Sequence, residues 1–201
     1  MSTHQEPQGP AEPAEAELVR ARLRTLAEAS GLPVPPMAVD KPRKEDRLPR
    51  VGEIDGEQTV LVPRSLLTAS PPRQLWYLAA CLGRLVSPEP RRRHRLGGLL
   101  LVLLLVAYLV LLFAARPPWL WITVLVLYPV GAWALRWERR AMEDAGRSVL
   151  AAAGHPPVEV ARAAFGADQD PPFLTRLLSP EPAPSRRIAA AEAASGADPS
   201  A

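Results

Sequence analysis

The sequence predicts a mainly α-helical protein with a small β-sheet, an α+β fold that carries a two-span transmembrane hairpin. Two charge-free apolar runs, 96–115 and 117–135, lie on either side of Arg116. A helix rises about 1.5 Å per residue, so about 20 residues cross roughly 30 Å of hydrocarbon. A charge at the bilayer centre would cost at least about 2.5 kcal/mol, and neither run contains one. We therefore expect membrane-spanning helices over 96–115 and 118–135.

Arginines flank this expected hairpin on both outer sides and predict its orientation. Arg116 is the only charged residue in the connection, whereas several arginines precede and follow the hairpin: Arg91, Arg92, Arg93, Arg95, Arg136, Arg139 and Arg140. The positive-inside rule then places both termini in the cytoplasm. Trp119, Trp121 and Trp133 fall near the ends of the second span, where interfacial aromatic residues anchor a helix. We expect a multi-pass protein of the cytoplasmic (inner) membrane, with the lipid bilayer as a partner.

Composition narrows the remaining possibilities. The one cysteine, Cys81, excludes an internal disulfide framework and fits a reducing compartment. The net charge is only +3, and the arginines lie beside the expected spans, so we interpret them as topology signals and headgroup contacts. We therefore predict no nucleic-acid partner. Richness in Ala, Arg, Pro, Gly and Leu is typical of a GC-rich bacterial genome.

The segment before the hairpin, 15–90, is expected to be a cytosolic α+β unit that follows a disordered tail over 1–14. Leu18, Leu23 and Leu26 predict a helix over 15–30 that stops at Gly31. We then expect one strand over 34–40 and two strands over 51–63 around Asp55-Gly56. A helical turn from 65 to 67 should follow, and then a helix over 72–86. The apolar stripe of that helix consists of Leu75, Leu78, Ala79, Leu82 and Leu85.

The segment after the hairpin, 136–194, is expected to be a cytosolic helical unit, followed by a disordered tail over 195–201. A long helix over 136–153 should end at Gly154, and two or three short helices should follow, the last near 185–194. Neither cytosolic segment has much core of its own. We therefore expect them to pack together beneath the membrane.

This order of elements resembles the membrane-embedded zinc metallopeptidases of the HtpX heat-shock protease and CAAX prenyl protease family. In that family the helix before the hairpin carries His-Glu-x-x-His, in which the two histidines bind zinc and the glutamate activates a water molecule. The string LLTASPPRQLWYLAACLGRLVSP resembles this region, with Leu82 and Gly83 matching. The two histidine positions fall on Ala80 and Arg84, and the catalytic glutamate position falls on Cys81.

Two further strings extend the resemblance. RRAMEDAGRSVLAAAG resembles the segment that carries the third zinc ligand, which falls on Met142; the family's Ala-Asp pair falls on Ala145 and Gly146. SPEPAPSRRI resembles the family's Ser-x-His-Pro tail, with Glu181 at the histidine position and matches at Ser179, Pro182, Arg187 and Ile188.

The resemblance therefore implies a metallopeptidase-like cytosolic module in degenerate form. No zinc ligand and no general base stands at the family's positions, and His4, His94 and His155 are not at a zinc-binding spacing. We predict no catalytic residue, no metal site and no cofactor. The face with Ala80, Cys81 and Arg84 should pack against the helix with Met142 and Gly146. In that contact Arg84 should reach Glu143, Asp144 or open water, because an unpaired buried guanidinium is costly.

Other residues admit two interpretations each. Cys81 is either a reactive thiol or, as we favour, a small buried hydrophobe. Glu138, Glu143 and Asp144 are either a carboxylate cluster for acid–base chemistry or, as we favour, a solvated face paired with Arg136, Arg139 and Arg140. The arginines over 91–95 either bind anionic lipid or act as topology signals only.

The favoured function is that of a catalytically inactive metallopeptidase homologue in the membrane, which acts as a binding or regulatory protein. Its partner would be another membrane protein or an active protease. Two alternatives stay open: an active zinc metalloendopeptidase that uses ligands at other positions, and a structural two-span membrane protein unrelated to peptidases.

Overall fold

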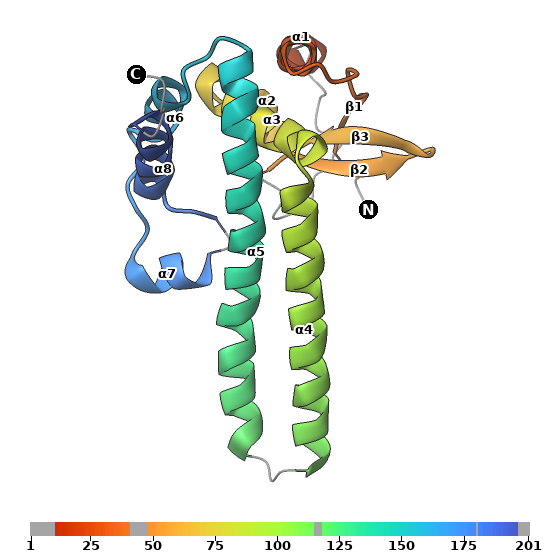
Figure 1. The fold of residues 1–201 in the computed structure, drawn as a ribbon, viewed down its shortest axis with the longest axis vertical. Coiled ribbons are helices and arrows are strands. Elements are labelled where there is room, and N and C mark those ends of the chain that lie inside the picture. The colour runs from red at the N-terminus through yellow and green to blue at the C-terminus, as the bar shows by residue number, and fades with distance from the viewer. Residues whose placement is uncertain (1–10, 41–47, 115–117, 180, 197–201) are drawn as a thin grey trace, which may run out of the picture.

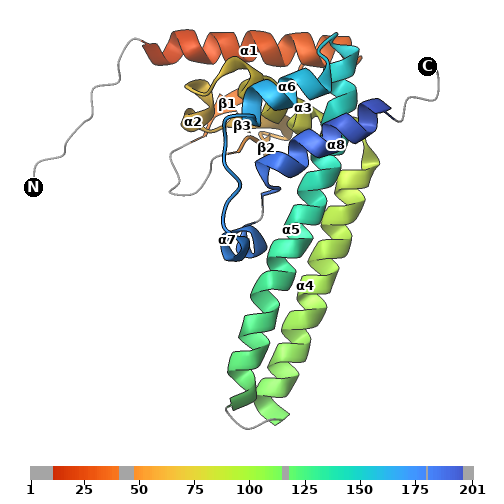
Figure 2. The ribbon, with the colours of Figure 1, turned by 90° about the vertical axis from the view of Figure 1, so that its left-hand side faces the viewer.

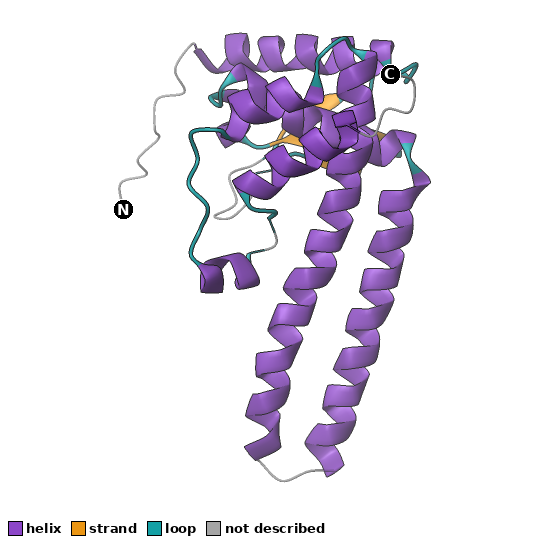
Figure 3. Ribbon diagram, turned by 60° about the vertical axis from the view of Figure 1, so that its left-hand side comes forward, coloured by secondary structure: helices purple, strands orange, loops and turns teal. Residues whose placement is uncertain are grey.

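The computed structural model describes residues 11–40, 48–114, 118–179 and 181–196, and within these ranges it does not describe certain side chains, including those of 111–129. Two long antiparallel helices extend from one side of a smaller α+β body (Figure 1). Most of the described chain is helical, with one three-stranded sheet (Figure 3). The predicted α+β class is therefore confirmed.

The first helix and the sheet form one side of the body. Helix α1 (Ala11–Ala29) lies across the end of the body and ends before Gly31, which has a positive φ of 67° (Figure 2). It begins at Ala11, so assigning 11–14 to a disordered tail was wrong; residues 1–10 lie outside the described part. The three strands are β1 (Met37–Val39), β2 (Arg50–Ile54) and β3 (Glu57–Val62).

The predicted β-hairpin is confirmed. Strands β2 and β3 are antiparallel, and the residues between them, Asp55 and Gly56, have φ values of 53° and 82°. A two-residue turn with positive φ at both positions suits the right-handed twist of the strands and is typical of Asp-Gly. Strand β1 pairs in parallel with β3, so the strand order is β1-β3-β2 and β2 is an edge strand in the described part of the chain.

Two helices follow the sheet directly. Helix α2 (Arg64–Leu67) is a single turn, and α3 (Pro71–Val86) matches the predicted second helix. The buried Gln74 amide donates hydrogen bonds to the carbonyls of Leu66, Leu67 and Ala69. These carbonyls lie at the end of α2 and in the segment that follows it, so Gln74 fixes the corner between α2 and α3.

Helices α4 (Pro88–Ala114) and α5 (Pro118–Ala152) are the two long antiparallel helices. Among the described residues, one helical stretch is long and apolar enough to cross a membrane, Pro88–Val110, and only 6% of its apolar part is buried. The arginines before the first expected span thus belong to α4 itself. The second expected span, 118–135, is part of α5, but most of its side chains lie outside the described part, so a two-span hairpin stays a prediction.

The chain after α5 returns to the body as three short helices, as predicted: α6 (Pro157–Phe165), α7 (Phe173–Leu178) and α8 (Pro184–Gly196). Helix α8 includes 195 and 196, which we had assigned to the disordered tail; 197–201 lie outside the described part. Arg73 on α3 donates to the Ala164 carbonyl and pairs with Asp168, which joins α6 to α3.

The two predicted cytosolic segments, 15–90 and 136–194, share one hydrophobic core, as predicted. Leu23 and Leu26 of α1, Val60 of β3, Leu78 of α3 and Leu150 of α5 are all essentially inaccessible to solvent. Trp76, Tyr77 and Phe165 add edge-to-face aromatic contacts between α3 and α6. Burying an aliphatic side chain contributes roughly 1.5–3 kcal/mol. Each segment therefore depends on the other for its stability.

Candidate functional site

Helices α3 and α5 cross at two glycines with their backbones almost in contact. A Cβ atom added at Gly83 would lie 2.6 Å from the backbone nitrogen of Gly146, and one added at Gly146 would lie 2.7 Å from the backbone nitrogen of Ala80. Only glycine permits such an approach. The predicted contact between the Ala80–Arg84 face of α3 and the Met142–Gly146 face of α5 is confirmed.

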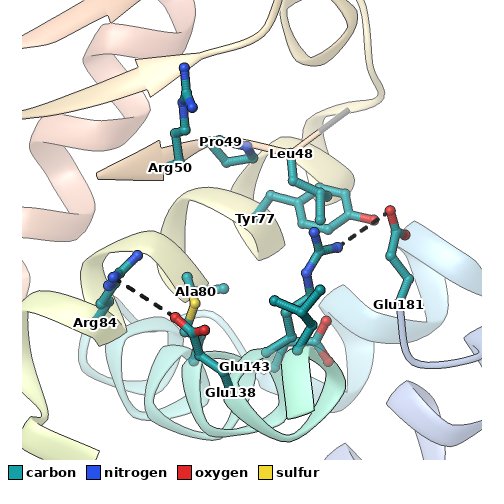
Figure 4. A pocket seen from close by; sticks show the side chains of 12 residues that line it. Leu48, Pro49, Arg50, Tyr77, Ala80, Arg84, Glu138, Glu143 and Glu181 are labelled. Atoms are coloured by element: carbon teal, nitrogen blue, oxygen red, sulfur yellow. Dashed lines mark ion pairs between the residues drawn. The ribbon is translucent and has the colours of Figure 1, made fainter. Parts of the chain in front are cut away.

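A cavity of about 240 Å³ opens beside this crossing. Helix α3, helix α5, the segment leading into β2 and the segment before α8 each contribute to its walls (Figure 4). Figure 4 shows Arg84 at one end and Glu181 at the other, with Ala80 and Tyr77 between them. The lining residues are Leu48, Pro49, Arg50, Tyr77, Ala80, Arg84, Leu135, Glu138, Arg139, Met142, Glu143 and Glu181. We call this cavity the α3–α5 pocket.

Four positions that the resemblance selected therefore meet in one pocket. Ala80 and Arg84 come from α3, Met142 from α5, and Glu181 from the segment before α8. Cys81 and Gly146 do not line the pocket. Cys81 is buried in the core, and Gly146 serves the helix crossing. The wall formed by Leu48, Pro49 and Arg50 was not predicted, because nothing local in the sequence shows where this segment lies.

The ionic partner of Arg84 differs from the predicted one. The Arg84 guanidinium lies 3.8 Å from the Glu138 carboxylate, whereas Asp144 pairs with Arg147 and Glu143 pairs with Arg187. Of the predicted alternatives, Glu143 and Asp144 were wrong, because Glu138 lines the pocket beside Arg84 and is the nearer carboxylate; open water is met in part. At 3.8 Å the pair is longer than a hydrogen bond, and Arg84 keeps part of its side chain in solvent.

Glu143 and Arg187 form the most deeply buried ion pair among the described residues. Arg187 Nε donates to Glu143 Oε1 at 2.8 Å, and the two side chains are only 4% and 10% exposed. The Arg187 guanidinium also lies over the Phe165 ring, 4.7 Å from its centroid, and donates to the Tyr77 hydroxyl. The prediction of a solvated carboxylate face was therefore wrong for Glu143 and for Glu138, both of which are buried.

This burial changes the acidities of the pair. Desolvation raises the pKa of the Glu143 carboxyl above its ordinary value, although the Arg187 guanidinium acts in the opposite direction. Burial alone would lower the pKa of Arg187, but Glu143, Tyr77 and Glu181 together outweigh it, and the net direction is upward. Each charge therefore offsets part of the cost of burying the other.

Glu181 faces two guanidinium groups without a close contact to either. Its carboxylate lies 3.6 Å from Arg139 and 3.8 Å from Arg187. The buried atoms Arg139 Nη1 and Arg187 Nη2 have no hydrogen-bond partner. Of these two arginines only Arg139 lines the pocket, so its Nη1 is a donor that a bound polar group, such as a backbone carbonyl or a carboxylate, could satisfy.

Cys81 has the environment of a structural residue. It is buried, and desolvation raises the pKa of its thiol to about 12, against a smaller opposing effect of Arg84. The nucleophilic form of cysteine is the thiolate, which this environment disfavours. The interpretation of Cys81 as a small hydrophobe fits its place in the core.

The described residues contain no group of three or more His, Cys, Asp or Glu side chains arranged to hold a metal ion. His155 is partly exposed after the end of α5, His4 lies outside the described residues, and the His94 side chain is not described. In the pocket itself, Ala80 offers no donor atom and Arg84 keeps its proton, so neither could ligate zinc.

Comparison of the chain with models of protein families, with curated proteins and with solved structures gave no match. The metallopeptidase resemblance therefore stays an expectation based on the sequence strings and on the order of elements.

Proposed function

We propose that this chain is a membrane-anchored binding protein whose metallopeptidase-like module has no catalytic metal. It would act as a scaffold or regulator of another membrane protein, such as an active protease. The observation that carries the proposal is the α3–α5 pocket, where the positions corresponding to the family's three zinc ligands, now Ala80, Arg84 and Met142, meet around one cavity together with Glu181, the histidine position of the family's tail.

The chemistry of the pocket supports binding rather than hydrolysis. Hydrolysis by this family requires a metal that lowers the pKa of a bound water, and the pocket holds arginine–carboxylate pairs instead. Strand β2 is an edge strand in the described part of the chain and begins at Arg50, which lines the pocket. An edge strand can pair its backbone with an extended segment of another protein. An extended polypeptide segment is therefore the partner chemistry that we favour.

Membrane anchoring is supported by the surface of the long helices. Leu103, Val106 and Val110 of α4 are each more than half exposed, and no soluble core covers them in the described structure. A monomeric soluble protein rarely exposes such a continuous apolar surface. Together with the arginines on the outer flanks, this favours a hairpin across the cytoplasmic membrane with both termini in the cytoplasm.

Installing the missing ligands tests the resemblance to the metallopeptidase module. In the variant Ala80→His/Arg84→His/Met142→Glu, two histidines one helical turn apart should face a glutamate across the pocket, which is a zinc-binding set. We expect the unsubstituted protein to purify without stoichiometric zinc and the triple variant to bind zinc, as measured by elemental analysis.

Met142→Glu alone is the companion variant. It adds a carboxylate to a pocket that already contains Glu138 and Glu143, so the free energy of unfolding should fall by roughly 1–3 kcal/mol. Met142→Gln, which is uncharged and similar in size, should cost less. Stoichiometric zinc in the unsubstituted protein would contradict the inactive form, and a folded triple variant that binds no zinc would contradict the metallopeptidase-like geometry.

Site-specific photocrosslinking tests the binding role. A photoreactive residue at Arg50, on the pocket wall, should crosslink to a membrane protein in native membranes, whereas the same residue at Arg24, exposed on α1, should not. The crosslink should weaken in the Glu181→Arg variant, which reverses the charge at one end of the pocket. Equal crosslinking from both positions, or none from Arg50, would refute the pocket as the binding site.

A further inference from the structure

Helix α7 lies apart from the rest of the body, beside the middle of α5 (Figures 1 and 2). Its first residue, Phe173, is 74% exposed, the highest value among the exposed large hydrophobic residues of the described part. The helix has the sequence Phe-Leu-Thr-Arg-Leu-Leu and no acidic residue. The Phe173 side chain is therefore an apolar surface that the described residues leave uncovered.

One contact fixes the level of α7 along α5. The Arg136 guanidinium donates two hydrogen bonds, of 3.2 and 2.7 Å, to the Ser179 carbonyl at the C-terminal end of α7. Arg136 is the first charged residue after the apolar run that ends at Leu135. The contact therefore places α7 at the boundary between the apolar and the charged parts of α5.

The same level carries other features typical of a membrane interface. The Trp133 and Trp137 rings stack at 5.8 Å, and Arg93 of α4 lies over the Trp137 ring at 5.2 Å. Aromatic rings and arginines gather where hydrocarbon meets headgroups, because each has an apolar part and a polar part.

Positive charge also accumulates beside α7. Desolvation lowers the pKa of Arg136, and the nearby cations Arg140 and Arg186 lower it further. Arg140 and Arg186 are both exposed. Asp170, the acidic residue facing α7, is bound by Arg176 and Ser185. Exposed arginines at this level are suited to anionic lipid headgroups.

We propose that α7 is an interfacial membrane helix, with Phe173 inserted among the lipids at the surface of the bilayer and Arg140 and Arg186 facing anionic headgroups. This inference rests on the proposed membrane hairpin, since without a bilayer around α4 and α5 nothing would bring lipid to this level. The hairpin and α7 would together fix how the α3–α5 pocket is held above the membrane surface.

Spin-label depth measurements on the full chain test the inference. Single cysteines carrying a nitroxide are placed at Phe173→Cys, at Val106→Cys on the apolar surface of α4, and at Ala163→Cys on the exposed face of α6. Cys81 is buried, so the unsubstituted protein provides the labelling background. The protein is placed in phosphatidylcholine vesicles, with or without phosphatidylglycerol. The measured quantity is each label's rate of collision with oxygen, relative to its rate of collision with a water-soluble nickel complex.

We expect the label at Val106 to be deep, the label at Ala163 to be in water, and the label at Phe173 to lie between them and to move deeper when phosphatidylglycerol is present. A deep Val106 label with a water-exposed Phe173 label would overturn the interfacial role of α7 while leaving the hairpin intact. A water-exposed Val106 label would overturn the hairpin itself. A Phe173 label at intermediate depth that does not respond to phosphatidylglycerol would overturn the role of the arginines.

Discussion

Replacing Arg187 with methionine is expected to lower the free energy of unfolding by about 3–5 kcal/mol, because it leaves the buried Glu143 carboxylate without its counterion. The side chain of methionine keeps much of the apolar volume against Phe165, so the loss of charge dominates. The measurement is thermal or denaturant unfolding of the detergent-solubilised protein. The matched control is Arg162→Met, which breaks an exposed pair that α8 makes with another helix, the pair of Arg162 on α6 with Glu192 on α8. Its cost should be at most about 1 kcal/mol.

The pH dependence of the Arg187 variant gives a second check. The pKa of Glu143 is raised by burial, and loss of the guanidinium should raise it further. A carboxyl with a raised folded-state pKa stabilises the fold when it is protonated, and this stability is lost as the pH rises through that pKa. The destabilisation should therefore be largest above the raised pKa of Glu143, should shrink as the pH falls through that pKa, and should be smallest below the ordinary value of 4.5. If the loss of unfolding free energy does not change with pH, packing rather than charge explains the effect. The double variant Arg187→Met/Glu143→Leu, which removes both charges, should recover most of the stability.

The second large effect is expected at the crossing of α3 and α5. Gly146→Ala places a Cβ within 2.7 to 2.9 Å of backbone atoms of Ala79 and Ala80, which cannot move aside as a flexible side chain could. The helices must separate, so we expect a loss of about 3 kcal/mol, at the upper end of the usual range for overpacking. Gly83→Ala should behave in the same way, because it meets the backbone of α5 at 2.6 Å.

The control for this prediction is Gly98→Ala on α4, where nothing lies within 4 Å of the added Cβ. Alanine favours a helix over glycine by roughly 0.5–1 kcal/mol, so this change should be neutral or stabilising. Both effects are read from the unfolding midpoint of the solubilised protein. If Gly146→Ala is as well tolerated as Gly98→Ala, the two helices do not cross at the distance described here.

Local rules explain which elements were predictable. The hairpin of β2 and β3 followed from Asp55-Gly56, a pair that readily adopts positive φ, and α3 followed from its apolar stripe. Errors arose where the deciding partner lies far away in the sequence. The parallel pairing of β1 with β3 depends on a crossover that no local pattern specifies. Glu143 has arginines at helical spacing on α5, so a surface ion pair was the local expectation, yet its partner is 44 residues away.

The sequence by itself determined most of the elements and the helical apolar run with its arginine flank, because these depend on residue type and local spacing. Only the tertiary structure decided that Ala80, Arg84, Met142 and Glu181 share one pocket, that Arg84 pairs with Glu138, and that Arg187 is buried against Glu143. The physical reason is that the docking of α8 and the glycine crossing of α3 and α5 are long-range packing events. Their energy is spread over side chains distant in sequence, and the charge pattern of any one helix does not reveal it.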